Sequence, residues 1–391
     1  MLLDRYNKSK YIYSKIEGKN KSNPFTMKGV EKEKIENLSD NTGILTTNKI
    51  NNMLQNVLDK VSLNKKSIFH NIYKDMSVLD LSERLLSKRP IVYFGEDDSF
   101  VIAENGKLLD GKGEYKYISM IKSKLLDFIH PDEAILSSYL GMILPSIVIN
   151  DGSRYNNGIP KGKFSDYPPT YVAAQVGARL EVKRSDYKSI FSKKEKLNDF
   201  ELSVREMLDS ECKEKNPTGS DRYRARSKII LESLIKSTEK VYQKEGQKVI
   251  LQITGLGLGV WSGSDTEQRE VDFIMGLMDS IESMSLIIKK KIKSIQLIWL
   301  PKLTKKQKII FNDFTGLKVI ETKEAPFSKK LLSEKTPVIS SFAWDGMSYL
   351  GNEYFVGLFS ASGDPAMASA TSISYLGSPL INPEAYKRYF N

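Results

Sequence analysis

Apolar positions change their spacing near residue 90, and this change separates two kinds of predicted secondary structure. Before it, apolar residues recur every three or four positions over residues 50–61 and 77–87, which predicts two amphipathic helices. After it, short apolar runs alternate with helical periodicity. We predict strands at residues 91–94, 100–103, 146–150, 176–182, 248–254, 294–300, 317–321 and 336–343, and helices at 115–129, 132–144, 199–209, 221–245, 265–284 and 365–375. This alternation predicts a three-layer α/β domain, a mixed sheet with helices on both faces.

Residues 1–46 are rich in Lys, Asn and Ser, and their apolar residues are scattered singly. Such a segment buries too little apolar surface to compensate for the entropy lost on ordering, so we predict a mobile arm. We divide the chain into a basic, largely disordered or helical arm at 1–75 and one α/β domain at 76–391. The arm holds fourteen Lys and Arg against eight Asp and Glu, so it carries +6 of the net charge of +11. The remaining domain is only mildly basic, which argues against a nucleic-acid surface.

The rare residue types exclude several kinds of site. The single cysteine, Cys212, excludes an internal disulfide and a Cys-based zinc cage, and it favours a reducing compartment. Two histidines, His70 and His130, exclude a His-rich metal site, and we predict no metal ligands. The chain start lacks a Sec-type signal pattern, and the longest apolar stretch, residues 134–149, is interrupted and too short to cross a bilayer.

The predicted strand at 248–254 opens into Gly255-Leu-Gly-Leu-Gly-Val-Trp261. Alternating glycines let a ligand approach backbone amides, and a helix start adds positive potential, so a diphosphate is the expected ligand. Val260 breaks the dinucleotide-binding glycine pattern, and no P-loop lysine follows. The alternative is an ordinary strand-to-helix turn whose glycines serve packing. We expect Ser264 and Glu267 to form a capping box. The candidate ligand-binding residues are Gly255, Leu256, Gly257, Leu258, Gly259, Val260 and Trp261.

Three acids at equal spacing follow the loop: Asp265, Asp272 and Asp279. At 100° per residue they share one stripe of the next helix, beside its apolar face. Asp265 and Asp272 are the catalytic candidates, because they are the acids nearest the glycine loop. The alternative is that they complement the helix dipole and line a solvated edge. We prefer that alternative for Asp279.

Other polar residues follow predicted strands, where α/β sheets often bind ligands. Asn150 and Asp151 form one such pair, and Asp345 and Glu353 lie in later loops. Asn150 and Asp151 are expected to help complete the site. For Asp345 and Glu353 the alternatives are catalysis, binding of ribose hydroxyls, or capping of loops alone. The arginines of the run at 222–226 spread around a helix, so we expect a salt-bridged surface there and not a phosphate site. His130 precedes a proline at a helix start, where a structural role is expected.

Several motifs occur together in one order: Asp166-Tyr-Pro-Pro-Thr-Tyr171, Val176-Gly-Ala-Arg-Leu-Glu181, Arg222-Tyr-Arg-Ala-Arg226, Gly255-Leu-Gly-Leu-Gly-Val-Trp261, Trp344-Asp-Gly346, Gly351-Asn-Glu-Tyr354 and Ser360-Ala-Ser-Gly-Asp-Pro365. This order resembles the macrodomain-like bacterial effector ADP-ribosyl hydrolases typified by MavL of Legionella, over roughly residues 80–391. The resemblance implies a macro-like ADP-ribose-binding fold, distantly similar to poly(ADP-ribose) glycohydrolases. It also implies that the acids after the Gly-Val-Trp sequence, Asp265 and then Asp272, take part in catalysis.

The resemblance further implies removal of ADP-ribose from modified arginine, on ubiquitin in the typical member. It places the protein in a host cytoplasm, delivered by a non-Sec route. The expected partners are an ADP-ribosylated protein or free ADP-ribose, and no nucleic acid. No cofactor is required, although an acid-rich site can accept Mg²⁺. The alternatives are a non-catalytic ADP-ribose reader or host-protein interaction module, and an enzyme that acts on NAD.

Overall fold

A computed structural model provides the structure of the chain. It describes residues 37–87, 91–94, 100–104, 107–111, 130–180, 190–192, 196–300, 303–305, 307–309, 311, 316–332, 335–346, 350–351, 354, 360, 362–376 and 386–388. Residues 1–36 of the predicted arm and the predicted helix at 115–129 lie outside the described residues.

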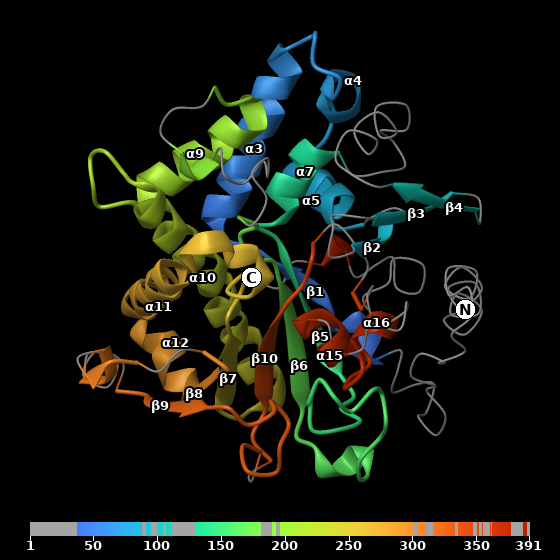
Figure 1. Cartoon of the computed structure of the whole chain (residues 1–391), viewed down its shortest axis with the longest axis vertical. Helices are drawn as coiled ribbons and strands as arrows, with labels where there is room; N and C mark the ends of the chain where they lie inside the picture. The colour runs from blue at the N-terminus through green and yellow to red at the C-terminus, as the bar shows by residue number, and fades with distance from the viewer. Residues whose placement is uncertain are drawn as a thin grey trace.

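A mixed sheet of seven strands forms the centre of the molecule (Figure 1), which confirms the predicted α/β class. Five neighbouring strands run parallel, and two on one side complete the mixed sheet. Across the sheet the strands are β1 (Gly43–Leu45), β5 (Gly141–Ser146), β6 (Thr170–Gln175), β10 (Val338–Ala343), β7 (Val249–Thr254), β8 (Ile292–Ile298) and β9 (Lys318–Thr322). Every residue of β6 and β7 is buried, as expected for apolar runs in parallel strands.

The last strand of the sheet in sequence, β10, lies in its middle. It pairs in parallel with β6 on one side and with β7 on the other. At the end of β10, Ala343 lies opposite Gln175, the last residue of β6. The carboxyl ends of β6, β10 and β7 are therefore side by side, and the loops that leave them meet at one edge of the sheet.

The long helix α10 (Gly219–Glu245) covers one face of the sheet. Tyr171 Oη donates to the Glu245 carboxylate at 2.6 Å, and Gln175 Nε2 donates to the Ile230 carbonyl at 2.8 Å. Thr218 begins α10 with a capping box, and Gly246 ends it in the left-handed conformation. These local signals explain why the sequence predicted this helix closely.

The other helices fall into groups around the sheet in Figure 1. On the α10 side they are α9 (Asp199–Glu211), α11 (Thr266–Glu282) and α12 (Leu286–Lys291), and beside β10 and β5 they are α15 (Gly363–Ala368) and α16 (Ile373–Leu376). Helix α11 packs directly on α10, because a Cβ at Gly276 would lie only 2.6 Å from the Arg224 carbonyl oxygen.

The segment from residue 43 to 86 contributes one strand to the main sheet and buried side chains to its core, and it spans the predicted division at residue 75. β1 adds to the sheet beside β5, and α3 (Asn48–Leu63) buries an apolar stripe that includes Leu54 and Val57. Helices α4 (His70–Tyr73) and α5 (Val78–Leu86) continue this layer, and Ser77 caps α5. The apolar periodicity of 50–61 and 77–87 predicted both long helices. Of these two helices, the predicted division placed only residues 50–61 in the arm.

Two short strands were predicted at 91–94 and 100–103, and both are present. β2 (Ile91–Phe94), β3 (Phe100–Glu104) and β4 (Lys107–Gly111) form a separate antiparallel sheet. β4 was not predicted, because its five residues contain a single pair of adjacent leucines and no alternation. It pairs with β3 along its whole length.

The predicted helix at 132–144 is wrong in its second half. Helix α7 (Pro131–Ser137) ends early, and β5 follows it. A Cβ at Gly141 would lie 2.7 Å from the Ala174 carbonyl oxygen, so sheet packing determines this segment. The strand predicted at 146–150 is reduced to one bridge between Val148 and Thr371.

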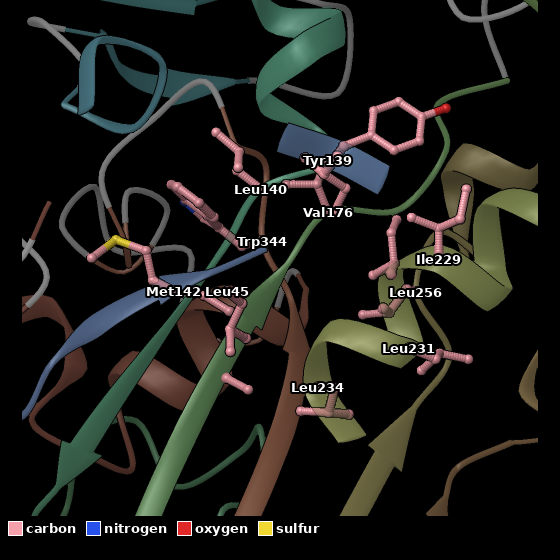
Figure 2. Close-up of a cluster of buried hydrophobic side chains, with 14 of the residues drawn as sticks. Leu45, Tyr139, Leu140, Met142, Val176, Ile229, Leu231, Leu234, Leu256 and Trp344 are labelled. Atoms are coloured by element: carbon pink, nitrogen blue, oxygen red, sulfur yellow. The ribbon is translucent and has the colours of Figure 1, made fainter. Parts of the chain in front are cut away.

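The strand predicted at 176–182 is displaced toward the amino terminus, where β6 ends at Gln175. Beyond this residue the chain leaves the sheet at Gly177, which contacts the loop after β7. Figure 2 shows the core around this point, with Val176, Leu256 and Trp344 near one another and Leu231 and Leu234 coming from α10. The hydrophobic core therefore extends to the carboxyl ends of β6, β7 and β10.

Candidate functional site

Three loops meet at the carboxyl edge of the parallel strands, and we call them the loop cluster: residues 176–180, 255–261 and 344–346. The Trp344 amide donates to the Gln175 carbonyl at 2.8 Å, which joins the loops after β10 and β6. The Leu180 amide donates to the Trp261 carbonyl at 2.7 Å, which joins the loops after β6 and β7. The sequence placed candidate ligand-binding residues in the second and third of these loops, and the structure brings the loop after β6 beside them.

Two of the three alternating glycines serve packing, as the strand-to-helix alternative proposed. Gly257 has φ of +75°, and a Cβ placed on Gly177 would lie 2.3 Å from the Gly257 nitrogen. The backbones of these loops therefore touch, and neither position can hold a side chain. At Gly255 a Cβ would meet Leu258 at 2.9 Å. Gly259 differs, because it is exposed and a Cβ there would meet nothing within 4 Å.

The amides of this loop are available to a ligand. Among the described residues, no partner accepts a hydrogen bond from the amides of Leu256, Gly257, Leu258 or Gly259. Leu256 and Gly257 are buried, so the accessible part of the loop is Leu258–Gly259. Backbone N–H groups grouped in a loop form a site for an anion.

The helix after the loop, α11, begins at Thr266, one residue after its predicted start. A 3-10 helix, η2 (Val260–Asp265), lies between the glycines and α11, with Gly263 at φ 68°. Asp265 is the N-cap of α11, and its side chain makes no capping hydrogen bond. The predicted capping box of Ser264 and Glu267 is therefore wrong. The kink at Gly263 separates the glycine loop from the first turn of α11.

Trp261 is half-buried at the beginning of η2, and its position is fixed by neighbours. The guanidinium carbon of Arg179 lies 5.7 Å from the centre of the Trp261 ring. Arg179 was not among the predicted site residues, although it lies within one of the motifs that support the resemblance. The available signal was a cation two residues after Gly177, at the end of a buried strand.

The loop after β10 places two further polar groups at this edge. Trp344 is 2% exposed, and its indole Nε1 is buried with no acceptor among the described residues. Asp345 follows it and is partly exposed. Gly346, at φ 73°, packs against Val176. Asp345 therefore lies in the loop cluster as predicted, while Glu353 lies outside the described residues.

The two catalytic candidates of α11 have different environments. The side chain of Asp265 is 68% exposed, and its carboxylate is 3.9 Å from Arg269. Asp272 is buried against α10, where it accepts from Ser220 Oγ at 2.5 Å, Gln268 Nε2 at 2.8 Å and Arg269 Nη1 at 3.2 Å. Asp265 is accessible to a ligand, whereas Asp272 is held between the two helices by three side chains.

Asp279 and the arginine run of α10 have structural partners. Arg224 makes two hydrogen bonds to Asp279, at 2.5 and 2.7 Å, so this acid ties α11 to α10 and does not form a solvated edge. Arg222 pairs with Asp209 at 2.6 Å. Arg226 is buried over the ring of Tyr139. The expected salt-bridged surface is present at Arg224, and the other two arginines are buried.

Asn150 and Asp151 were expected to complete the site, and the structure corrects this. β5 runs antiparallel to β6, so the chain after β5 leaves at the opposite edge of the sheet. Asn150 is fully buried and donates to the carbonyls of Ile159 and Ser369. Burial would raise the pKa of Asp151, and hydrogen bonds from its own loop outweigh this and lower it. Strand direction, which the sequence did not indicate, decides this outcome.

His130 has the structural role expected of it. It is the N-cap of α7, where its Nδ1 accepts from the Asp132 amide at 3.2 Å. Within the described part of the chain, no group of three His, Cys, Asp or Glu side chains is placed to hold a metal ion. Of the helices described, none is both long and apolar enough to cross a membrane.

A hollow of about 350 Å³ lies away from the loop cluster, between α9, α10 and α11. Its charged lining includes Glu211, Arg224, Lys228 and Asp279. Those four side chains pair among themselves, Arg224 with Asp279 and Lys228 with Glu211. Because these charged side chains pair with one another, the hollow is not a candidate catalytic site.

Known proteins match most of the chain, including all three loops. The family model described as ADP-ribosylhydrolase MavL-like matches residues 32–199 and 179–389. The chain is similar to ADP-ribosylarginine hydrolase CG3568 of Drosophila melanogaster, at 25% identity over 80% of this chain and 70% of the relative. It is also similar to ADP-ribosylarginine hydrolase CG2909 of the same fly, at 18% identity with the same coverage. The family match begins before β1, in agreement with the place of β1 and α3 in the main domain.

Proposed function

Because this chain belongs to the MavL-like ADP-ribosylhydrolase family, we propose that it removes ADP-ribose from arginine side chains of modified proteins. The names of the two Drosophila relatives support arginine as the linkage. The structural observation that carries the proposal is the exposed Leu258–Gly259 backbone, whose amides have no acceptor among the described residues. Such donors suit the diphosphate of ADP-ribose.

The ligand-binding residues of the proposal are those of the loop cluster. The diphosphate lies along the loop from Gly255 to Val260, on the accessible amides near Gly259. Trp261 packs against the distal ribose, and Asp345 binds a ribose hydroxyl. This arrangement directs the anomeric carbon toward the start of α11, where Asp265 is exposed.

The reaction needs water as its only co-reactant, so we propose no cofactor. Water oxygen bonds to the anomeric carbon while the bond to the arginine nitrogen breaks, and the guanidine leaves with a proton. Positive charge develops on the sugar, and a nearby carboxylate stabilises it. Asp265 orients the ribose and activates the water. Asp272, the second candidate, acts through Arg269, whose guanidinium lies between the two acids.

Two finer parts of the proposal rest on the resemblance to the bacterial effectors. They are ubiquitin as the modified protein and the host cytoplasm as the place of action. The Drosophila relatives carry the hydrolase name without either feature. A second ADP-ribosylated protein is therefore needed beside ubiquitin in any assay, because equal turnover of both would contradict the choice of ubiquitin.

The decisive experiment measures release of ADP-ribose from arginine-ADP-ribosylated ubiquitin. We expect turnover by the unaltered protein and a loss of at least a hundredfold, about 3 kcal/mol, in Asp265→Ala. Asp279→Asn is the matched control, because this acid lies two α11 turns beyond Asp272 and pairs with Arg224. Equal slow release by the unaltered protein and Asp265→Ala would contradict catalysis at this site. Tight binding of free ADP-ribose without release would identify a reader.

A further inference from the structure

Trp299 directly follows strand β8, at the same edge of the sheet as the glycine loop. β8 pairs in parallel with β7, and their last residues, Ile298 and Thr254, lie opposite each other. The backbones of the next residues, Trp299 and Gly255, are therefore one strand spacing apart, about 4.8 Å. The contact continues past the strands, because a Cβ on Gly255 would lie 3.2 Å from Leu300 Cδ2. The chain after β8 thus borders the first residue of the glycine loop.

The backbone of Trp299 is strained. Its φ is +57°, in the left-handed region that a bulky side chain rarely adopts and that glycine or asparagine fits better. Hydrogen bonds to the end of β9 hold this conformation. The Trp299 amide donates to the Thr322 carbonyl at 3.0 Å, and Lys323 Nζ donates to the Leu300 carbonyl at 3.2 Å. Residues kept in such conformations cluster at ligand sites, so this position calls for a functional reason.

The indole of Trp299 is fixed by its edge and remains accessible. Its Nε1 donates to the Lys323 carbonyl at 2.9 Å, which sets the orientation of the ring. The residue is nevertheless 39% exposed. Packing within the protein therefore does not explain why a large aromatic side chain occupies a strained position. A fixed and accessible aromatic ring provides a surface on which a nucleobase can stack.

We infer that Trp299 binds the adenine of ADP-ribose by stacking. This inference rests on the proposed function, which puts the distal ribose at Trp261 and the diphosphate along the loop from Gly255 to Val260. The adenosine, at the other end of the ligand, then leaves the loop at Gly255, beside the end of β8. The loop cluster supplies donors for the diphosphate and the ribose, and Trp299 supplies the contact for the base.

Calorimetric titration with ADP-ribose and with inorganic pyrophosphate tests this inference. The main variant is Trp299→Gly, because glycine accepts the left-handed backbone and the substitution removes only the ring. We expect it to weaken ADP-ribose binding about ten- to a hundredfold, the range for the loss of one stacked base. Pyrophosphate has no base, so its affinity should stay unchanged. Trp299→Phe should recover part of the ADP-ribose affinity, since it keeps an aromatic ring.

Tyr155→Ala is the matched control, because it removes a 74% exposed aromatic side chain after β5, at the opposite edge of the sheet. It should leave the affinity for ADP-ribose unchanged. Weaker binding of both ligands by Trp299→Gly would mean that Trp299 only supports the glycine loop, which overturns the inference. Unchanged ADP-ribose binding by Trp299→Gly would overturn this inference alone. If the unaltered protein binds no ADP-ribose, the proposed function fails as well, which distinguishes the two cases.

Discussion

The loop cluster and the helical layer of α9, α10 and α11 differ in whether their polar groups have partners within the protein. In the helical layer the acids are paired: Asp272 with Arg269, Asp279 with Arg224, and Glu211 with Lys228. In the loop cluster, backbone amides near Gly257 and the indole nitrogen of Trp344 have no acceptor among the described residues. The richest set of paired charges therefore lies in the helical layer and not in the loop cluster.

This comparison teaches that unpartnered donors identify a site better than a count of acids. A buried polar group without a partner costs roughly 1–3 kcal/mol, so a fold keeps one where a ligand compensates for it. Paired acids have already satisfied their hydrogen-bonding capacity within the protein. The four predictions below test this comparison, and the first has the largest expected effect on stability.

We expect Asp272→Ala to destabilise the protein by about 3 kcal/mol, because it leaves Arg269 buried without its closest anion. Asp265→Ala should change the free energy of unfolding by less than about 0.5 kcal/mol, because its side chain is exposed. Urea unfolding followed by circular dichroism measures both. If Asp272→Ala keeps full stability and loses turnover, Asp272 belongs to the catalytic machinery and the comparison is wrong.

Gly177→Ala should cost about 1–3 kcal/mol of stability, because its methyl group would overlap the Gly257 backbone. The same substitution also separates the two loops, so binding of ADP-ribose should weaken in parallel. Gly259→Ala is the counterpart, with open space around its Cα and an expected change below about 0.5 kcal/mol. Thermal unfolding of both variants gives the answer. Equal stability of the two would show that the loops separate without cost.

Glu211 gives the helical layer a dependence on acid pH. Burial alone would raise the pKa of Glu211, and hydrogen bonds from the Lys228 and Lys49 ammonium groups outweigh it and lower that pKa. The stabilisation is therefore present above the ordinary pKa of a glutamate and is lost as pH falls through the lowered value. We expect Glu211→Gln to lower the free energy of unfolding by about 1 kcal/mol or less at pH 7. The curve of this free energy against pH should also become flatter on its acid side. In the exposed Glu214→Gln control the acid side should stay unchanged.

The last prediction concerns the chemical reactivity of the Cys212 thiol and not the stability of the protein. Burial and the nearby Asp209 carboxylate raise the pKa of this thiol to about 11. At pH 8 it should therefore react with iodoacetamide about a hundredfold more slowly than an exposed thiol, since the thiolate is the reactive form. Mass spectrometry across pH 8–11 follows the rate. A fast reaction at pH 8 would show that the end of α9 opens in solution.

Local patterns predicted the elements that carry their own signals. The buried run of β7 and the capped helix α10 are present almost where their periodicity placed them. The glycine loop was also located, because alternating glycines after an apolar strand are a local feature. One of its glycines, Gly257, proved to contact Gly177, a residue about eighty positions away, and no local pattern contains that information.

Errors arose where the partner of a segment was distant in sequence. The second half of the predicted helix at 132–144 became β5, because it pairs with β1 and β6. Asn150 and Asp151 were placed at the wrong edge, because strand direction depends on that pairing. Arg179 was missed because a single cation after a buried strand has no periodicity. Its significance comes from Trp261, which lies in another loop.

The central place of β10 also constrains how the protein is made. Without residues 338–343, the ladder from β1 to β6 and the ladder from β7 to β9 share no strand. During translation the other six strands of the sheet leave the ribosome before β10. The two strand edges that β10 joins therefore stay unpaired until it emerges. Nascent chains of this kind are candidates for chaperone protection. The same order means that the proposed pocket lacks one of its three loops until β10 has formed, so we expect a truncated product without β10 to have no hydrolase activity.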